Sequence, residues 1–285
     1  MRTNVLVTGA NGQLAKCINE LYQKNNEDIS YIFLTKSELD ISSQKELSNF
    51  FKDHDVQYCV NCAAYTQVDQ AEEFPQSAFE INGDAVGKLA IECKKNNVIL
   101  VHISTDYVFD GEKGSPYLED DRTAPINIYG ASKLKGEQLI EDILEKYYII
   151  RASWLYSAYG KNFVKTIVRL VKENKQLSIV DSQLGSPTSC YDLSRFIHFL
   201  IVNKGVKFGI YHFSATNTAN WYEFAKHITT HFPKYDKSML KAVSEYRSAA
   251  KRPSYSVLSL DKTKKVYSNL GPWQESVDHV IEKVL

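Results

Sequence analysis

Tyr129 and Lys133 stand four residues apart in YGASKLKGE (129–137), a segment with good helix formers. On a helix, two side chains at this spacing lie on one face, one turn apart. A phenol can give or take a proton, and a nearby ammonium group favours its ionised form. The pair could therefore take part in proton transfer. A solvated helix face explains the segment equally well when it is taken alone.

Two hydroxyl residues follow the apolar run VILVHI. Ser104 and Thr105 begin STDYVFDG (104–111), and doubly wound sheets bind ligands at the carboxyl ends of such strands. Either hydroxyl could therefore contact a bound ligand. The alternative is a turn-forming role, which is common for hydroxyl residues at strand ends.

A glycine-rich turn lies near the N-terminus. VLVTGANGQLAK joins an apolar strand to a helix start, with Gly9, Gly12 and Ala15 at three-residue intervals. Backbone N–H groups in such a turn and at the helix N-terminus can bind a pyrophosphate. The spacing differs from the usual dinucleotide fingerprint. We predict a dinucleotide site here, with an ordinary strand-to-helix turn as the alternative.

The end of the second expected strand bears on the choice of cofactor. Proteins built for NAD usually place an acid there, on the ribose 2′-hydroxyl. In FLTKSELD the positions are Thr35 and Lys36, and the first acids are Glu38 and Asp40. A lysine suits a 2′-phosphate, so we expect NADPH. NADH is the alternative, because Lys36 could equally be an ordinary surface charge.

The elements that must position these residues alternate between strand and helix through the first half of the chain. Apolar runs at 4–10, 31–34, 56–64, 98–104 and 147–154 are separated by helical patterns. This order predicts right-handed crossovers and an α/β fold, a doubly wound parallel sheet of Rossmann type. We place a dinucleotide-binding domain at 1–155 and a smaller, mainly substrate-binding lobe at 156–285. Segments at about 176–215 are expected to add to the first domain.

Composition narrows the class of partner. The 285-residue chain carries 34 basic and 34 acidic residues, so its formal net charge is zero. This balance argues against nucleic acid and acidic membrane surfaces as partners. No apolar run approaches the roughly 20 residues that span a bilayer. The N-terminal sequence also lacks the pattern of a secretion signal. We expect a cytoplasmic protein.

Cysteine usage agrees with a reducing compartment. The five cysteines (Cys17, Cys59, Cys62, Cys93 and Cys190) are odd in number and lack the spacing of a disulfide framework. Cys59 and Cys62 form a CxxC pattern at an expected strand end. Side chains three apart on a strand point to opposite faces, so we predict that both are structural.

The glycine-rich turn, the strand-end hydroxyl and the Tyr-x-x-x-Lys helix together resemble the catalytic set of the extended short-chain dehydrogenases/reductases. Within them, the chain resembles the dTDP-4-dehydrorhamnose reductase family. The motifs that carry this resemblance occur in order over nearly the whole chain: TGANGQLA, LDIS, NCAAYTQVDQAE, FEIN, STDYVFDG, INIYGASKLKGE, RASWLY, GKNFVKT, QLGSPT and RPSYS.

The resemblance implies reduction by NAD(P)H of the C4 ketone of a nucleotide sugar, dTDP-4-dehydro-6-deoxy-L-mannose (dTDP-4-dehydrorhamnose). Tyr129 would donate the proton. Lys133 would bring the pKa of that phenol toward neutral pH and hold the nicotinamide ribose. Thr105 would bind the same substrate oxygen.

The same resemblance assigns the binding residues. For the cofactor these are Gly9, Asn11, Gly12, Gln13 and Leu14 at the pyrophosphate, Asp40 and Ile41 at the adenine, Ala63, Ala64 and Tyr65 at the ribose, and Asn82 near the nicotinamide. For the sugar nucleotide they are Val68, Asp69, Thr105, Asp106 and Trp154. Three of them have structural alternatives: Trp154 as core, Asp40 as a helix cap and Asp69 as a helix-start residue.

We expect no metal ligands. The resemblance implies that some members of the family bind a divalent cation at a dimer contact, through an acid just after the glycine-rich turn. In this chain Lys16 and Cys17 fill that region. Magnesium prefers oxygen ligands, so we expect activity that does not require it. The resemblance is compatible with a homodimer.

Other functions remain in competition. By the same resemblance, dehydratases of this superfamily carry Thr-Asp-Glu at the strand end and use the two acids to eliminate water. This chain has Thr105-Asp106-Tyr107 instead, and the missing glutamate argues against dehydration. An epimerase would retain its cofactor tightly, so cofactor stoichiometry would identify it. A non-catalytic, reductase-like regulatory subunit need not keep the three catalytic groups that are present here.

Overall fold

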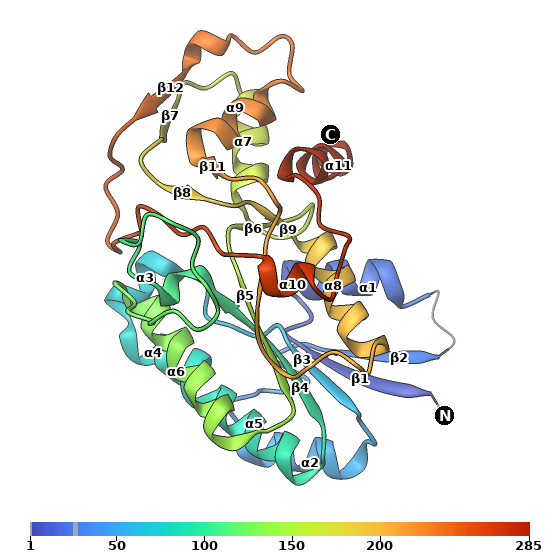
Figure 1. The fold of residues 1–285 in the computed structure, drawn as a ribbon. Coiled ribbons are helices and arrows are strands. Elements are labelled where there is room, and N and C mark those ends of the chain that lie inside the picture. The colour runs from blue at the N-terminus through green and yellow to red at the C-terminus, as the bar shows by residue number, and fades with distance from the viewer. Residues whose placement is uncertain (1, 25–27) are drawn as a thin grey trace.

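A six-stranded parallel sheet forms the centre of the fold (Figure 1). A computed structural model of the chain describes residues 2–24 and 28–285. The strands lie in the order β10-β5-β4-β3-β1-β2. They are β1 (Thr3–Thr8), β2 (Ile29–Leu34), β3 (Tyr58–Asn61), β4 (Ile99–Thr105), β5 (Tyr147–Ala152) and β10 (Gly209–Phe213). The order reverses at β1, and the predicted doubly wound α/β fold is confirmed.

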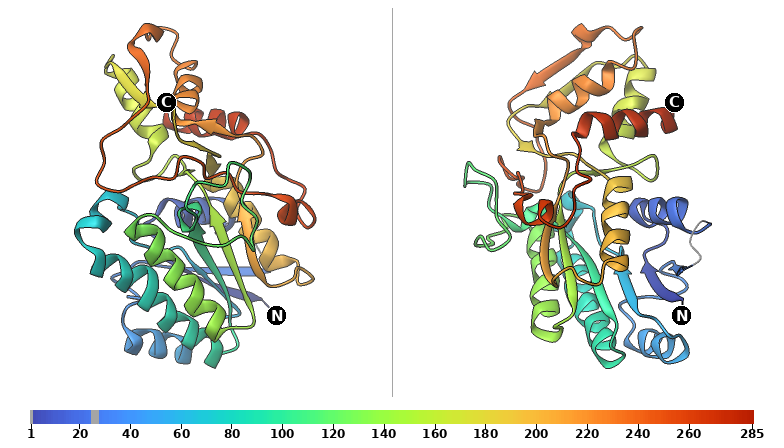
Figure 2. Two further views of the ribbon diagram at one scale, coloured as in Figure 1. Left: turned by 60° about the vertical axis from the view of Figure 1, so that its left-hand side comes forward. Right: turned by 45° about the vertical axis from the view of Figure 1, so that its right-hand side comes forward.

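Helices cover both faces of this sheet (Figure 2). One face carries α2 (Gln44–Asp53), α5 (Ala85–Lys95) and α6 (Ile128–Ile143), and the other carries α1 (Gln13–Tyr22) and α8 (Cys190–Val202). Strand β1 shows why its sequence is a continuous apolar run. Leu6 packs into the core on the α2 and α5 face, whereas Val5 and Val7 pack on the α1 and α8 face. Alternate side chains are thus buried on opposite faces.

The segment 75–95 is helical but not one regular α-helix. A short α4 (Pro75–Phe79) leads into a π-helical turn, η1 (Glu80–Asp84), which continues as α5. Helix α6 crosses this turn closely, since a Cβ at Gly136 would lie 2.2 Å from the carbonyl oxygen of Asn82. The glycine permits the close approach, and the wider turn presents Asn82 toward α6.

A second lobe lies beyond the carboxyl ends of the central strands (Figures 1 and 2). It contains α7 (Phe163–Lys172), α9 (Trp221–Thr229) and α11 (Trp273–Val284), with β7 (Leu177–Val180) paired to β12 (Leu240–Val243). The remaining elements are α3 (Val68–Glu73), η2 (Asp106–Val108), β6 (Leu155–Tyr156), β8 (Leu184–Gly185), β9 (Thr188–Ser189), β11 (Ala219–Asn220), η3 (Lys237–Met239) and α10 (Asp261–Lys264).

The chain crosses between the two lobes more than once. After α7 and β7, helix α8 and strand β10 return to the central sheet, where β10 pairs with β5. Of the segments at 176–215 expected to join the first domain, α8 and β10 pack on or pair with the central sheet. Strand β7 does not, because it pairs with β12 in the second lobe. We propose a division in which α8 and β10 belong with the dinucleotide-binding domain. None of the helices in the described part of the chain is long and apolar enough to cross a membrane.

A buried ion pair fixes α6 against the sheet. Arg151 on β5 donates from Nε and Nη2 to the carboxylate of Glu137 on α6, with a shortest distance of 2.7 Å, and both side chains are almost fully buried. Removing one partner of such a pair leaves an uncompensated buried charge, which typically costs about 3–5 kcal/mol. The pair therefore holds the helix that carries Tyr129 and Lys133.

Candidate active site

A cavity of about 780 Å³ opens at the carboxyl ends of the central strands. Eleven of the residues assigned from the sequence line it: Asn11, Gly12, Gln13, Leu14, Ala64, Val68, Thr105, Asp106, Tyr129, Lys133 and Trp154. The glycine-rich turn, the strand-end hydroxyl and the Tyr-x-x-x-Lys helix therefore meet at one site.

Tyr129 lies in the first turn of α6, whose start is fixed on both sides. Asn127 caps the helix by accepting from the Gly130 N–H at 2.7 Å, and its own amide donates to the Lys251 carbonyl at 2.8 Å. Gly130 is required by space, since a Cβ there would lie 2.1 Å from the Tyr107 carbonyl oxygen. The helix can thus approach the end of β4 closely enough to bring Tyr129 near Thr105 in the cavity wall.

Tyr129 and Thr105 line the same cavity, and the Thr105 hydroxyl lies close enough to the phenol to affect its ionisation. Loss of solvent around the phenol and the nearby Asp106 together raise the pKa of Tyr129 to about 12, although the Thr105 hydroxyl acts in the opposite direction. Tyr129 is therefore fully protonated at neutral pH and can serve as a proton donor.

Asp106 is buried beside this pair. Thr105 Oγ1 donates to Asp106 Oδ1 at 3.0 Å, and Oδ2 has no hydrogen-bond partner among residues 2–24 and 28–285. Burial raises the pKa of Asp106 to about 6, against the hydrogen bonds that lower it. A buried carboxylate oxygen without a partner is costly in the protein alone and suits a hydroxyl of a bound molecule.

Lys133 is only 2% exposed, and its ammonium group contacts residues near the end of β4. Nζ donates to the Ile103 carbonyl oxygen at 2.6 Å and lies 3.1 Å from Nε2 of His102. Burial lowers the pKa of Lys133 to about 8. The expected lowering of the Tyr129 pKa by Lys133 is therefore not found in this arrangement, because burial and Asp106 dominate around the phenol.

A buried polar chain continues behind Lys133. Thr8 Oγ1 and the Ala63 N–H both donate to Asn61 Oδ1, at 2.6 and 3.2 Å, and the Asn61 amide lies 3.1 Å from His102 Nδ1. Burial, with a smaller effect of Lys133, holds the pKa of His102 well below its usual value, so the imidazole is neutral. The chain links the ends of β1, β3 and β4 to the lysine.

The glycine-rich turn has the form that a phosphate group requires. Gly9 has φ of 65°, and a Cβ there would lie 2.7 Å from the Ala63 nitrogen. Gly12 precedes α1 without a side-chain cap, so N–H groups at the start of the helix face the cavity. Gln13 reaches toward the second lobe, where its amide donates to the Leu155 carbonyl at 3.3 Å.

The two residues assigned to the adenine do not line the cavity. Asp40 accepts from the N–H and hydroxyl of Ser42, at 2.9 and 2.8 Å, and lies 3.7 Å from Lys36. It stabilises the turn before α2, whose N-cap is Ser43. Ile41 is buried in the core beneath this turn. Lys36 is 75% exposed at the end of β2 and is open to a ligand.

Four further assigned residues also lie outside the cavity lining: Gly9, Ala63, Tyr65 and Asn82. Asn82 is fully buried, and its amide joins the backbone of Tyr65, at 2.8 and 3.0 Å, to the hydroxyl of Ser132 on α6, at 3.0 Å. Its side chain therefore positions the loop after β3 against α6.

Asp69 is also engaged elsewhere. On α3 it pairs with Arg252, with Nη2 2.8 Å from Oδ2, and it accepts from the Ala250 N–H at 3.1 Å. Arg252 belongs to the RPSYS motif, so this pair connects the C-terminal part of the chain to α3, next to the cavity residue Val68. The sequence separation of 183 residues hides this contact from local patterns.

Trp221 is a cavity residue that the sequence analysis did not identify. It stacks on Trp154 with ring centroids 3.6 Å apart and planes at 10°, and its indole N–H donates to Gln183 at 3.0 Å. Trp154 has φ of 49°, an uncommon conformation for a bulky residue. Strained backbone of this kind often marks a functional site, and the one available signal was an aromatic pair at a helix start.

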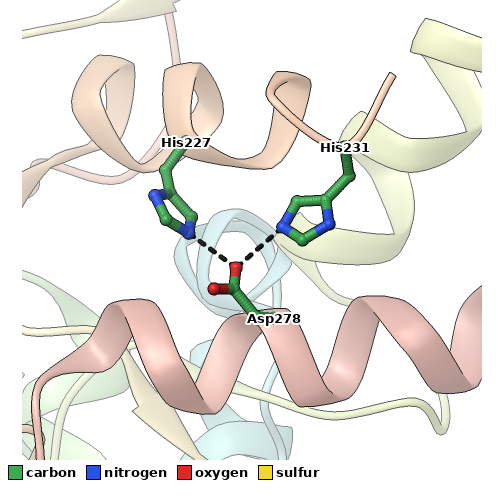
Figure 3. Close-up of side chains that lie close together, drawn as sticks. All are labelled: His227, His231 and Asp278. Atoms are coloured by element: carbon green, nitrogen blue, oxygen red, sulfur yellow. Dashed lines mark hydrogen bonds and ion pairs between the residues drawn. The ribbon is translucent and has the colours of Figure 1, made fainter. Parts of the chain in front are cut away.

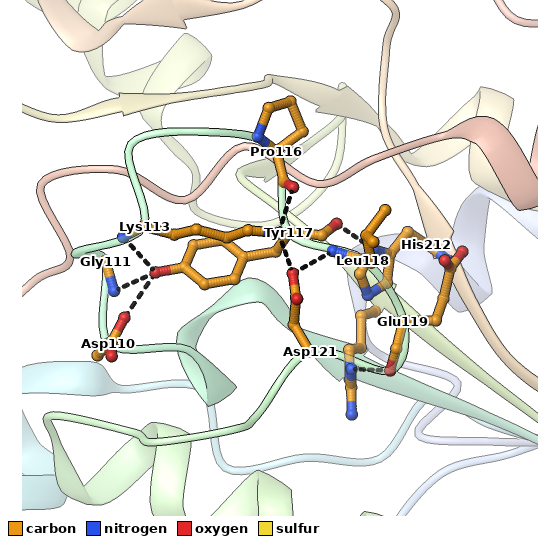
Figure 4. A network of polar contacts seen from close by, with 10 residues as sticks. Asp110, Gly111, Lys113, Pro116, Tyr117, Leu118, Glu119, Asp121 and His212 are labelled. Carbon is orange, nitrogen blue, oxygen red and sulfur yellow. Dashed lines mark hydrogen bonds and ion pairs between the residues drawn. The ribbon is translucent and has the colours of Figure 1, made fainter.

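The loop between β4 and α6 is held by a polar network around Tyr117 (Figure 4). Its hydroxyl donates to Asp110 at 2.6 Å and accepts from the N–H groups of Gly111 and Lys113, at 2.9 and 3.2 Å. The Tyr117 carbonyl oxygen lies 3.1 Å from His212 on β10. This network fixes the segment that leads from Thr105 to Tyr129.

Comparison with known proteins agrees with this geometry. Residues 2–285 match the family described as RmlD substrate binding domain. The dTDP-4-dehydrorhamnose reductase of Sinorhizobium fredii is 36% identical, over 98% of this chain and 97% of that protein. The dTDP-4-keto-6-deoxy-D-glucose reductase of Streptomyces niveus is also 36% identical, over 90% of this chain and 88% of that protein.

A solved structure extends the likeness to three dimensions. The dTDP-4-dehydrorhamnose reductase of Bacillus anthracis, crystallised in complex with NADP, is 38% identical and superposes with a TM-score of 0.91. The match covers 99% of this chain and 100% of that one. On the family match and these full-length identities, the chain belongs to the dTDP-4-dehydrorhamnose reductase family.

Proposed function

We propose that this protein reduces the C4 ketone of dTDP-4-dehydrorhamnose with NADPH and forms dTDP-L-rhamnose. One observation carries the proposal: Tyr129 and Thr105 meet at the wall of a large cavity, and Lys133, one helical turn from Tyr129, lines the same cavity. A proton donor, an oxygen-binding hydroxyl and a cation are the groups that ketone reduction requires.

The residues around the glycine-rich turn fit a dinucleotide. The tight contact of Gly9 with Ala63 and the uncapped start of α1 leave backbone N–H groups available to a pyrophosphate. Asn11 to Leu14 would hold that group, and Lys133 would hold the ribose next to the nicotinamide. When bound, the cofactor supplies the hydride.

The side chains of the protein then account for the proton. Thr105 donates a hydrogen bond to the C4 oxygen as negative charge develops there. Tyr129 gives its phenolic proton to the same oxygen. With a pKa of about 12, the phenol is a stronger acid than the sugar alcohol that forms, so the transfer is favourable.

The opposite wall of the cavity suits the nucleotide sugar. Trp154 and Trp221 offer a flat aromatic surface, and Val68 adds an apolar contact beside it. The unpaired Oδ2 of Asp106 is available to a sugar hydroxyl. These groups support a ligand with a planar base and a hydroxyl-bearing ring.

The position that distinguishes dehydratases supports a reductase. Tyr107 occupies the place of the second acid, and its ring packs edge-on against Tyr129 with centroids 5.9 Å apart. A carboxylate for elimination is therefore replaced by an aromatic contact on the proton donor. All five cysteines are free thiols, which supports a reducing, cytoplasmic setting for the reaction.

The test is turnover of the purified protein with NADPH and dTDP-4-dehydrorhamnose, followed by loss of the 340 nm absorbance and by identification of the product. The D-gluco substrate, dTDP-4-keto-6-deoxy-D-glucose, serves as the comparison. We expect one NADPH consumed per rhamnose nucleotide formed and slower turnover of the D-gluco compound. Tightly retained cofactor with no net consumption would instead indicate an epimerase, and no turnover would support a regulatory subunit.

A further inference from the structure

Two histidines and an aspartate converge on the outer part of the second lobe (Figure 3). His227 lies on α9, His231 follows one turn later just past the end of that helix, and Asp278 lies on α11. Nε2 of each histidine lies 2.7 Å from the same atom, Asp278 Oδ1. Within residues 2–24 and 28–285, this is the only group of three potential metal ligands with their ligand atoms within 4.8 Å of one another.

We propose that His227, His231 and Asp278 form a zinc site that links α9 to α11. Zinc takes histidine nitrogen and aspartate oxygen at about 2.0–2.2 Å and favours four ligands in a tetrahedron. Two imidazoles and one carboxylate supply three of these, and water supplies the fourth. Magnesium and calcium require oxygen donors, so the donor set selects a borderline transition metal.

The spacing of the donor atoms is close to that required. Ligand atoms on a tetrahedral zinc lie about 3.3–3.5 Å apart when each bond is about 2.1 Å. The present N–O distances of 2.7 Å are those of N–H groups donating to a carboxylate. To bind zinc, each imidazole presents the lone pair of Nε2 and keeps its one proton on Nδ1. The longer ligand separation then moves Asp278 outward by about 0.6–0.8 Å at these bond lengths. Its side chain is 41% exposed and has room to make this shift.

The surrounding contacts hold the two helices in place before any ion binds. Trp273, the first residue of α11, packs edge-on against His227 with centroids 5.1 Å apart and against Phe224 at 5.4 Å. The two histidines are 25% exposed, so an ion and a water molecule can reach them. The site is therefore preorganised and open, which are the conditions for binding without refolding.

This site differs from the metal expectation made from the sequence. That expectation of no ligands rested on Lys16 and Cys17 beside the glycine-rich turn. His231 and Asp278 are 47 residues apart and meet only because α9 packs on α11. None of the three residues lines the cavity, so the proposed zinc is structural and independent of the reductase proposal.

Zinc titration of the untagged protein, stripped with EDTA and then freed of chelator, tests the site by isothermal calorimetry. We expect one zinc per chain in the wild type. His227→Gln and His231→Gln should each weaken binding at least tenfold, since each removes a ligand. His54→Gln is the matched control, because His54 is a histidine stacked on Phe50 in the other lobe. Magnesium should give no binding heat.

Thermal unfolding provides a second readout. Zinc should raise the Tm of the wild type and of His54→Gln, because a ligand that binds only the folded state stabilises it. It should not raise the Tm of the double variant H227Q/H231Q, whose fold is checked by circular dichroism. Equal zinc affinity in the wild type and the double variant would overturn the proposal. So would a wild type that binds zinc and magnesium equally.

Discussion

Lys133 Nζ lies 3.1 Å from His102 Nε2. The hydrogen bonds around Asn61 indicate which ring nitrogen of His102 carries the proton. The Asn61 oxygen accepts from Thr8 Oγ1 at 2.6 Å and from the Ala63 N–H at 3.2 Å, which leaves the Asn61 amide N–H directed toward His102 Nδ1. A neutral imidazole that accepts at Nδ1 bears its proton on Nε2. That proton points at Lys133 and favours its uncharged amine, in agreement with a pKa lowered by burial to about 8.

The ionisation of Lys133 predicts an alkaline limit to activity. Lys133 must be charged to attract the cofactor, and its pKa of about 8 in the free protein places the loss of that charge within the accessible range. We expect kcat/KM for NADPH to fall about tenfold per pH unit above this value. Measurement from pH 6 to 10 should show the limb in the wild type and not in Lys133→Met. A flat wild-type profile through pH 9.5 would exclude this assignment.

Asp106 predicts a gain in stability at the expense of function. Its folded pKa of about 6 exceeds the usual value of 3.8, so its ionisation destabilises the fold as pH rises from about 4 to 6 and the cost then persists. Asp106→Asn removes the charge and should stabilise the protein by about 1–3 kcal/mol at pH 7, with almost no gain near pH 4. Urea unfolding at both pH values measures the difference. Equal effects at pH 4 and 7 would contradict the linkage.

Cofactor choice should depend on Lys36. Its exposed ammonium at the end of β2 is available to a 2′-phosphate, so we expect a higher kcat/KM with NADPH than with NADH. Lys36→Asp replaces attraction with repulsion and should move the ratio toward NADH by roughly tenfold or more, about 1.4 kcal/mol. Lys45→Asp on α2 is the charge-matched control and should leave the ratio unchanged. A wild type that prefers NADH would refute the assignment.

Trp221 should serve binding more than chemistry. Trp221→Ala removes half of the stacked pair that faces the cavity and should raise KM for the nucleotide sugar about tenfold, as loss of an aromatic anchor of roughly 1–2 kcal/mol implies. We expect kcat within threefold of wild type, and Trp221→Phe should restore most of the affinity. A fall in kcat with unchanged KM would instead place Trp221 in the catalytic step.

The sequence predicted the parts of this fold that arise from local pattern. The apolar runs became strands buried on both faces, and the segment at 129–137 lies in α6 as expected. Cys59 is buried in the core, as a structural role predicts, whereas Cys62 lines the cavity. The strands, the helix and the burial of Cys59 follow from periodicity or from the geometry of neighbouring residues, without reference to distant parts of the chain.

The remaining features depend on contacts that no local pattern contains. The π-helical turn at 80–84 is matched to Gly136 on another helix. His102 stands within an apolar run and looks like a core residue, yet its partner is Lys133. Asp69 appears as a helix-start residue, but Arg252 takes its carboxylate. Tertiary packing decides each of these positions, so the sequence located the site but not the orientation of its side chains.

The most direct test of the account is steady-state turnover of Tyr129→Phe with NADPH and dTDP-4-dehydrorhamnose, beside Lys133→Met and the double variant. Tyr129→Phe should lower kcat by about 10²–10⁴-fold while cofactor still binds, as expected for lost general acid catalysis. Lys133→Met should do comparable damage and also weaken cofactor binding. Because the two residues act as one unit, the double variant should be little worse than the more damaged single variant. Near-wild-type turnover in a folded Tyr129→Phe protein, checked by circular dichroism, would contradict the mechanism.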